Sequence, residues 1–111
     1  MEIVFKSKKL KKNCEEIKYA QKKWGEENAR KIVKRLNEID SFENLAELQK
    51  FTPARLHKLT GKRKEQYAID IKQPFRLIIE PMNINKEKNE ENELENITKV
   101  KIIEVINYHD E

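Results

Sequence analysis

Hydrophobic positions recur at helical spacing through the first 40 residues of the chain. Between residues 7 and 24 they form one apolar stripe on a surface of lysine and glutamate, at Leu10, Cys14, Ile17 and then Gln21 or Trp24. The stripe predicts one amphipathic helix, which Gly25 separates from a second helix. The second apolar face consists of Ala29, Ile32, Val33, Leu36 and Ile39. Four basic residues are expected on the solvent side of this helix: Arg30, Lys31, Lys34 and Arg35. Two such helices in succession predict a helical hairpin.

A short third helix is predicted after the hairpin. Asp40, with Glu43 three residues later, resembles a capping box for a helix over residues 43–49. Pro53 prevents a simple continuation of this helix, because proline lacks the amide hydrogen that the next helical turn needs.

Hydrophobic residues alternate with polar ones, or form short apolar runs, in four other segments, which predicts strands. These segments are residues 2–6, 66–71, 75–81 and 98–106. The connection over residues 72–74 is short enough for a hairpin. The last segment is apolar on both faces, so we expect it in the centre of the sheet. Residues 83–96, rich in Asn, Glu and Lys, are expected to form a flexible acidic loop.

Residues 1–111 are therefore expected to form a single α+β domain. The predicted order is βααβββ with a short extra helix. A small antiparallel sheet packed against the N-terminal helical hairpin would bury all of the apolar stripes together. The length of 111 residues is common for one domain.

The net charge of +4 is distributed unevenly along the chain. Residues 1–76 contain 20 Lys and Arg against 11 Asp and Glu, whereas residues 77–111 contain 4 against 9. The basic part is a candidate surface for nucleic-acid phosphates or for an acidic protein partner. A lysine-rich surface that only keeps the protein in solution explains the same composition equally well.

The cellular compartment is indicated by the cysteine count and the apolar runs. Cys14 is the single cysteine, so an intramolecular disulfide is impossible and a reducing compartment is the natural assumption. The chain starts with only three consecutive apolar residues before a lysine, and no stretch approaches the length of a membrane span. These observations predict a cytoplasmic protein with no membrane partner.

Motifs of most enzyme classes are missing from the sequence. Gly25 and Gly61 are the two glycines, so there is no glycine-rich phosphate loop, and there is no serine-centred elbow. No Cys/His cluster has metal-ligand spacing, so no metal and no other cofactor is expected. The remaining candidates are basic and proton-transferring side chains around the predicted sheet: His57, Lys58, Lys62, Arg63, Lys64, Arg76, Tyr108 and His109.

These side-chain types fit one reaction. Cleaving RNA without a metal needs a base for the 2′-hydroxyl proton, a cation for the charge on phosphorus and an acid for the leaving 5′-oxygen. Each candidate also has an ordinary structural explanation. A lone histidine in a loop is more often a surface residue than a catalyst. Arg76 can pair across the sheet with Glu80 or Asp70, Tyr108 can be an edge residue of the core, and residues 62–64 are typical of a solvated turn.

Three motifs together resemble the HigB-type branch of the RelE/ParE toxins. They are Leu56-His57-Lys58-Leu59-Thr60-Gly61 before a strand, Phe75-Arg76-Leu77 within a strand, and the C-terminal pair Tyr108-His109. The order of predicted elements agrees with that family over nearly the whole chain. The resemblance implies a toxin of a type II toxin–antitoxin system that cuts messenger RNA in the ribosomal A site without a metal. It also implies an antitoxin partner, expected to contain a helix-turn-helix, through which the toxin would reach operator DNA.

The resemblance assigns roles to matching positions. It implies that His57 and His109 transfer protons, that Arg76 stabilises the phosphate and that Tyr108 positions or stacks on the RNA. The expected RNA contacts are Lys58, Lys62, Arg63 and Lys64. The chain departs from the family at Asn107, where an acidic residue is frequent and where an amide cannot act as a carboxylate. It also has Gly61-Lys62-Arg63 where the family often has Gly-Asp-Arg.

Two other functions stay open from the sequence. One is a ParE-like toxin that binds DNA gyrase and performs no chemistry, and the other is an inactive relative that only binds its antitoxin. The two histidines and Tyr108 favour the nuclease, because a toxin that only binds has no need of proton-transfer groups.

Overall fold

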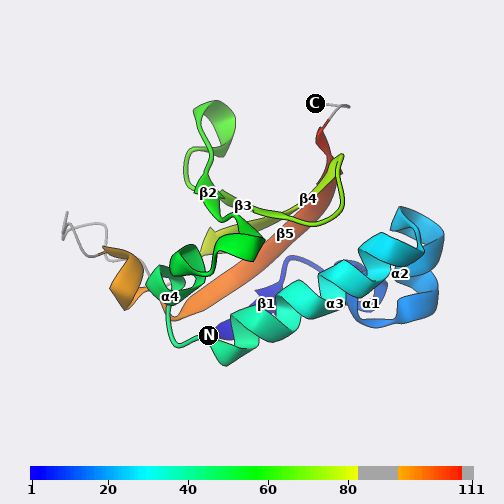
Figure 1. Cartoon of the computed structure of the whole chain (residues 1–111), viewed down its shortest axis with the longest axis horizontal. Helices are drawn as coiled ribbons and strands as arrows, with labels where there is room; N and C mark the ends of the chain where they lie inside the picture. The colour runs from blue at the N-terminus through cyan, green and yellow to red at the C-terminus, as the bar shows by residue number, and fades with distance from the viewer. Residues whose placement is uncertain (83–92, 109–111) are drawn as a thin grey trace.

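Four strands of the five-stranded sheet form from the segments predicted as strands, and the fifth is a two-residue strand that the sequence pattern did not predict (Figure 1). The computed structural model describes residues 1–82 and 93–108. The strands are β1 (Glu2–Phe5), β2 (His57–Lys58), β3 (Tyr67–Asp70), β4 (Phe75–Pro81) and β5 (Lys99–Asn107). Their order in the sheet is β1-β5-β4-β3-β2, so β5 is internal, as its two apolar faces predicted. The predicted α+β class is confirmed.

The sheet is mixed, which differs from the antiparallel sheet expected from the sequence. Strands β2 to β5 are antiparallel neighbours, but β1 runs parallel to β5, with Glu2 opposite Lys99. Alternation of apolar residues fixes which face of a strand is buried and carries no information about strand direction. Strands β1 and β5 lie far apart in the chain, so no hairpin connection constrained their relative direction either.

The predicted first helix is two helices. Helix α1 (Lys8–Glu15) is capped by the Ser7 hydroxyl, and α2 (Ile17–Trp24) follows after Glu16, whose backbone is extended. This break turns Ile17 out of the predicted apolar stripe and leaves it 47% exposed. Gly25, with a φ of 90° that favours glycine, then separates α2 from α3 (Glu26–Ser41), as the sequence predicted.

The short helix α4 (Leu45–Lys50) begins later than expected, and its cap is a different residue. Asn44 accepts a hydrogen bond from the Glu47 amide at 3.0 Å, and the Glu47 carboxylate accepts one from the Glu43 amide at 2.8 Å. The predicted cap at Asp40 is wrong because α3 continues through that residue to Ser41. The one-turn helix η1 (Thr52–Ala54) follows, and it includes Pro53.

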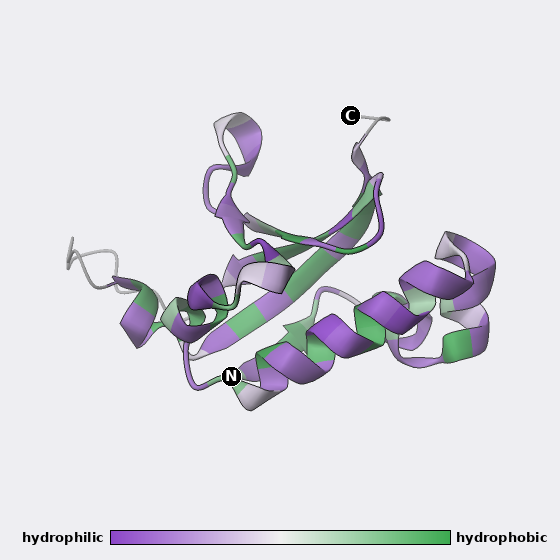
Figure 2. Ribbon diagram, viewed as in Figure 1, coloured by the Kyte–Doolittle hydropathy of each residue, from purple (hydrophilic) through white to green (hydrophobic). Residues whose placement is uncertain are grey.

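Each face of the sheet has its own hydrophobic cluster. Helices α1 to α3 lie on one side in Figure 1, and the larger clusters form there, with α3 and α4 packed over Ile69, Leu77 and Ile102. The other face has a smaller cluster, covered by Leu59, of Ala68, Ile78, Ile103 and Ile106. Figure 2 shows the alternating hydrophobic and hydrophilic bands along β5 and α3 that produce this separation.

Arg35 is buried in this structure, although the sequence placed it on the solvent side of α3. Only 7% of its surface is exposed. Its Nε donates to the carbonyl of Asp70 at 2.9 Å, and its Nη2 donates to the carbonyl of Pro53 at the same distance. The carboxylate of Glu38 accepts two hydrogen bonds from its Nη1. One guanidinium therefore ties α3 to the end of β3 and to η1.

The segment expected as a flexible acidic loop is partly structured. Residues Glu93–Asn96 form the 3₁₀ helix η3, and Leu94 packs on the larger core cluster. Residues 83–92 lie outside the described residues. Over residues 1–82 and 93–108, no helix is long and apolar enough to cross a membrane.

We expect Arg35→Ala to cost about 3 kcal/mol or more of the free energy of unfolding, because it leaves the partly buried Glu38 carboxylate and two carbonyls without their donor. Urea denaturation would measure the change. Arg30→Ala is the control, since Arg30 pairs with Glu26 on an exposed surface and its loss should change stability by less than about 1 kcal/mol. Equal effects of the two substitutions would contradict a structural role for Arg35.

Candidate functional site

Three of the sequence-predicted site residues meet on the face of the sheet opposite the helices. His57 in β2 lies opposite Ala68, and Arg76 in β4 lies opposite Asp70 and Ile106. Ala68 and Ile106 belong to the smaller hydrophobic cluster, so His57 and Arg76 share its face. β2 has only two residues, too few to show alternation, so the sequence placed His57 before the first hairpin strand.

His57 is held by one contact at each ring nitrogen. Its Nδ1 lies 2.7 Å from the carbonyl oxygen of Arg55, and its Nε2 lies 3.3 Å from Nη1 of Arg76. A carbonyl only accepts and a guanidinium only donates, so both contacts are satisfied when Nδ1 carries the hydrogen and Nε2 accepts. In this tautomer the accepting nitrogen of the imidazole, Nε2, faces Arg76.

Tyr108 completes the group from the end of β5. The guanidinium carbon of Arg76 lies 3.9 Å from the centroid of the Tyr108 ring, which is a cation–π contact. Tyr108 is 52% exposed, so part of the aromatic side chain is open to solvent beside the arginine. Arg76 thus lies between an imidazole and a phenol ring.

Asp70 and Arg55 also belong to this group, although no sequence motif marked them as site residues. The Asp70 carboxylate lies 3.7 Å from Nε of Arg76 and 3.2 Å from Nη1 of Arg55. The first contact confirms the ordinary cross-strand pairing that the sequence left open for Arg76. Arg55 has a left-handed backbone, with φ of 47°, which no sequence pattern of the loop marked.

A groove runs along this group at the β2–β3 edge of the sheet. Its volume is about 560 Å³, and it is lined by Gln49, Thr52, Arg55, Leu56, His57 and Arg76. Two arginines and one histidine therefore face one open groove. Such a surface suits an extended anionic ligand.

The expected RNA-contacting residues differ in their exposure to solvent. Lys58, Lys62 and Lys64 are exposed on β2 and around the turn η2 (Gly61–Arg63). Arg63 is instead partly buried, and it donates to Gln66 at 2.8 Å and forms an ion pair with Glu104. Arg63 therefore anchors the turn to β5, on the face of the sheet that contains the group around Arg76.

The predicted role of His109 concerns a residue outside the described part of the chain. Asn107 is the last residue of β5, opposite Phe75. Within residues 1–82 and 93–108, no group of three His, Cys, Asp or Glu side chains is arranged to hold a metal ion.

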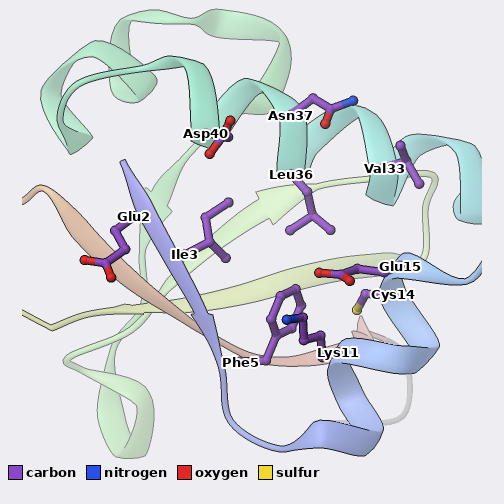
Figure 3. A pocket seen from close by; sticks show the side chains of 10 residues that line it. All are labelled: Glu2, Ile3, Phe5, Lys11, Cys14, Glu15, Val33, Leu36, Asn37 and Asp40. Atoms are coloured by element: carbon purple, nitrogen blue, oxygen red, sulfur yellow. The ribbon is translucent and has the colours of Figure 1, made fainter.

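A second groove lies between β1, α1 and α3, on the helix side of the sheet (Figure 3). Its volume is about 520 Å³, and Ile3, Phe5 and Leu36 point into it. Cys14 also lines it, and burial raises the pKa of this thiol to about 12, so the thiol stays protonated and unreactive at neutral pH. The charged residues around this groove are mainly acidic: Glu2, Lys11, Glu15 and Asp40.

Comparison with known protein families supports the resemblance seen in the sequence motifs. Residues 3–99 match the family of HigB-like toxins, described as the RelE-like toxin of the type II toxin–antitoxin system HigB. The matched range includes His57 and Arg76 and ends before Tyr108. No curated protein sequence matches the chain. The family match covers most of the chain, and with the observed α+β fold it shows that this protein belongs to the HigB-like toxins of type II toxin–antitoxin systems.

Proposed function

We propose that this toxin cuts messenger RNA on the ribosome by a metal-independent reaction, and thereby inhibits translation in the cytoplasm. The observation that carries the proposal is the placement of Arg76, whose guanidinium contacts the His57 ring at Nε2 and packs on the Tyr108 ring. A proton acceptor, a fixed cation and an exposed aromatic ring are thereby combined beside one groove.

His57 is the proposed base. Because Nδ1 donates to the Arg55 carbonyl, the lone pair of the ring is at Nε2, on the side of Arg76. In the reaction, Nε2 takes the proton of the 2′-hydroxyl while the 2′-oxygen forms a bond to phosphorus. The contact between Nε2 and Arg76 must therefore open when RNA binds. Its length of 3.3 Å is at the long end for such a hydrogen bond, which fits that requirement.

Arg76 is the proposed stabiliser of charge on the phosphate. Asp70 and Tyr108 hold its guanidinium, and this reduces the ordering that is needed at the moment of reaction. The exposed ring of Tyr108 is suited to stack on a base next to the scissile bond. The bond from phosphorus to the 5′-oxygen breaks, and His109 is the proposed acid that protonates this oxygen.

The RNA-contacting role proposed for the basic turn applies best to Lys58, Lys62 and Lys64, which are exposed. Such lysines contribute affinity through phosphate contacts and do not take part in bond breaking. Arg63 also serves the fold through Glu104, so its replacement affects two properties at once.

The second candidate function is a toxin that binds DNA gyrase without chemistry. The pairing of Arg76 with Asp70 is compatible with it, since that ion pair also stabilises the sheet. The contact of His57 Nε2 with Arg76 beside the groove favours the nuclease, because binding alone does not require a proton acceptor next to a cation.

We expect His57→Ala and His109→Ala to reduce messenger cleavage by roughly 10²–10⁴-fold, since each removes a proton-transfer group. Arg76→Ala should reduce it through loss of charge stabilisation. The measurement is translation-coupled cleavage of a defined message, with growth arrest on expression scored in parallel. Replacing Lys62 and Lys64 together should instead weaken ribosome binding and leave the cleavage rate of bound toxin nearly unchanged.

Arg30→Gln is the matched control for these substitutions, because Arg30 is an exposed arginine on α3 with a partner on its own helix. Growth arrest of equal strength for wild type and all three site variants, with no message cut, would exclude the nuclease. Gyrase binding would then be the better explanation.

The antitoxin partner that the family implies is proposed to bind with an acidic, amphipathic segment over α1 and α2. Residues 8–24 contain seven lysines and two glutamates. Ile17 and Tyr19 are exposed among them, by 47% and 44%, and Lys12 lies over the Tyr19 ring. The groove of Figure 3 is less suited to such a segment because carboxylates outnumber lysine around it. We propose that a helix-turn-helix in the antitoxin provides the contact with operator DNA.

Binding of the antitoxin should weaken by roughly tenfold or more between low and high salt, because exposed charge pairs are screened. Lys18→Glu and Lys22→Glu on α2 should weaken it further at low salt. Lys50→Glu on α4 makes the same charge change away from α2 and should have little effect. Isothermal titration at several salt concentrations gives the comparison, and affinity that does not depend on salt would contradict this surface.

A further inference from the structure

Neither the Asp70 carboxylate nor the Arg55 guanidinium contacts RNA in the reaction proposed above, yet Arg55 lines the groove and Asp70 contacts both of its arginines. The Asp70 side chain is 15% exposed and faces two guanidinium groups, those of Arg55 and Arg76. A carboxylate is the wrong sign of charge for a surface that binds RNA. Attraction between the protein and RNA therefore does not explain its position between two arginines.

The position of this carboxylate is fixed by the backbone. Asp70 is the last residue of β3, directly opposite Arg76, where the two-residue strand β2 no longer covers the edge of β3. The buried Arg35 occupies this edge and donates to the Asp70 carbonyl at 2.9 Å. Asp70 is thus anchored from the helix side, while its carboxylate reaches the arginines on the open side.

The two arginine side chains differ in how exposed they are and in how many partners they already contact. The Arg76 side chain is 20% exposed and is already in contact with His57 and Tyr108. The Arg55 side chain is 67% exposed, and both residues line the groove of about 560 Å³ with Gln49 and Thr52. A guanidinium is planar and can bind one carboxylate oxygen and still offer other donors to a phosphate.

We propose that Asp70 holds Arg55 and Arg76 side by side as a two-arginine site for the phosphodiester backbone of RNA. Arg76 contacts the scissile phosphate, and Arg55 contacts the backbone in the adjoining part of the groove toward Thr52. Asp70 is a positioning residue, which acts on the RNA only through the two arginines. The inference rests on the proposed function in taking RNA as the ligand.

A purely electrostatic effect of the Asp70 carboxylate and a positioning role predict changes of opposite sign in RNA affinity when Asp70 is replaced. If the carboxylate only reduced the positive charge of the groove, Asp70→Asn would remove a repulsion and tighten RNA binding. If it positions the arginines, the same substitution should weaken binding by roughly threefold to tenfold, which corresponds to the cost of ordering a long side chain on binding.

The experiment uses the full-length toxin and a fully 2′-O-methylated RNA hexanucleotide, which binds but cannot be cut through a 2′-hydroxyl. Titration is followed by the ¹⁵N–¹H signals of the arginine Nε groups. The signals of Arg55 and Arg76 should both shift. That of Arg30, whose side chain is also 67% exposed, should not. Arg55→Gln should weaken binding by roughly threefold to tenfold and reduce the slope of log affinity against log salt by about 0.7.

Arg30→Gln is the matched control and should leave both affinity and slope unchanged. Asp70→Asn keeps the shape of the side chain and the carbonyl that Arg35 binds, and thermal unfolding checks that it folds. If it does not fold, the Arg55→Gln and wild-type titrations still decide the case.

An Arg55 signal that shifts no more than that of Arg30, or Asp70→Asn binding as tightly as wild type or more tightly, would overturn the inference. Failure of this inference and failure of the nuclease proposal would give different results. A wild-type toxin that cuts no message but binds the hexanucleotide through Arg55 and Arg76 would retain this site, whereas cleavage without involvement of Arg55 would remove it alone.

Discussion

The buried guanidinium of Arg35 is the interaction on which the arrangement of the other parts depends. It connects α3 to the carbonyls of Asp70 and Pro53, and its charge is balanced by Glu38. A buried arginine is costly unless all of its donors are used, so its partners are held in one geometry. Because one partner is the last residue of β3, the helix layer fixes a point on the edge of the sheet from which the open face is built.

The two faces of the sheet differ in how much hydrophobic surface they bury. One face carries the larger hydrophobic clusters under α1 to α4, and this burial supplies most of the driving force for folding. The other face needs only a small cluster around Ile78 and Leu59, and its remaining area holds His57, Arg76 and Tyr108. Polar and charged side chains can therefore be accommodated on this face at little cost to the hydrophobic core.

Arg76 has both the structural and the functional contacts that the sequence left open as alternatives. It pairs across the sheet with Asp70, as a structural residue does, and it also contacts His57 and Tyr108, as a functional residue is expected to do. The group could be predicted in part because histidine, arginine and tyrosine stand in recognisable motifs. Asp70 and Arg55 could not, because a cross-strand partner and a left-handed loop residue have no signature in one sequence.

The sequence by itself determined the elements with a clear period: the helix α3, the strands β3, β4 and β5, and the central place of β5. Burial of an apolar face is a local property, so its period can be read along the chain. Only the tertiary structure decided the break at Glu16, the parallel direction of β1 and the burial of Arg35. Each of these depends on a partner distant in the chain or on backbone angles that most residues can adopt, and so no periodic pattern encodes it.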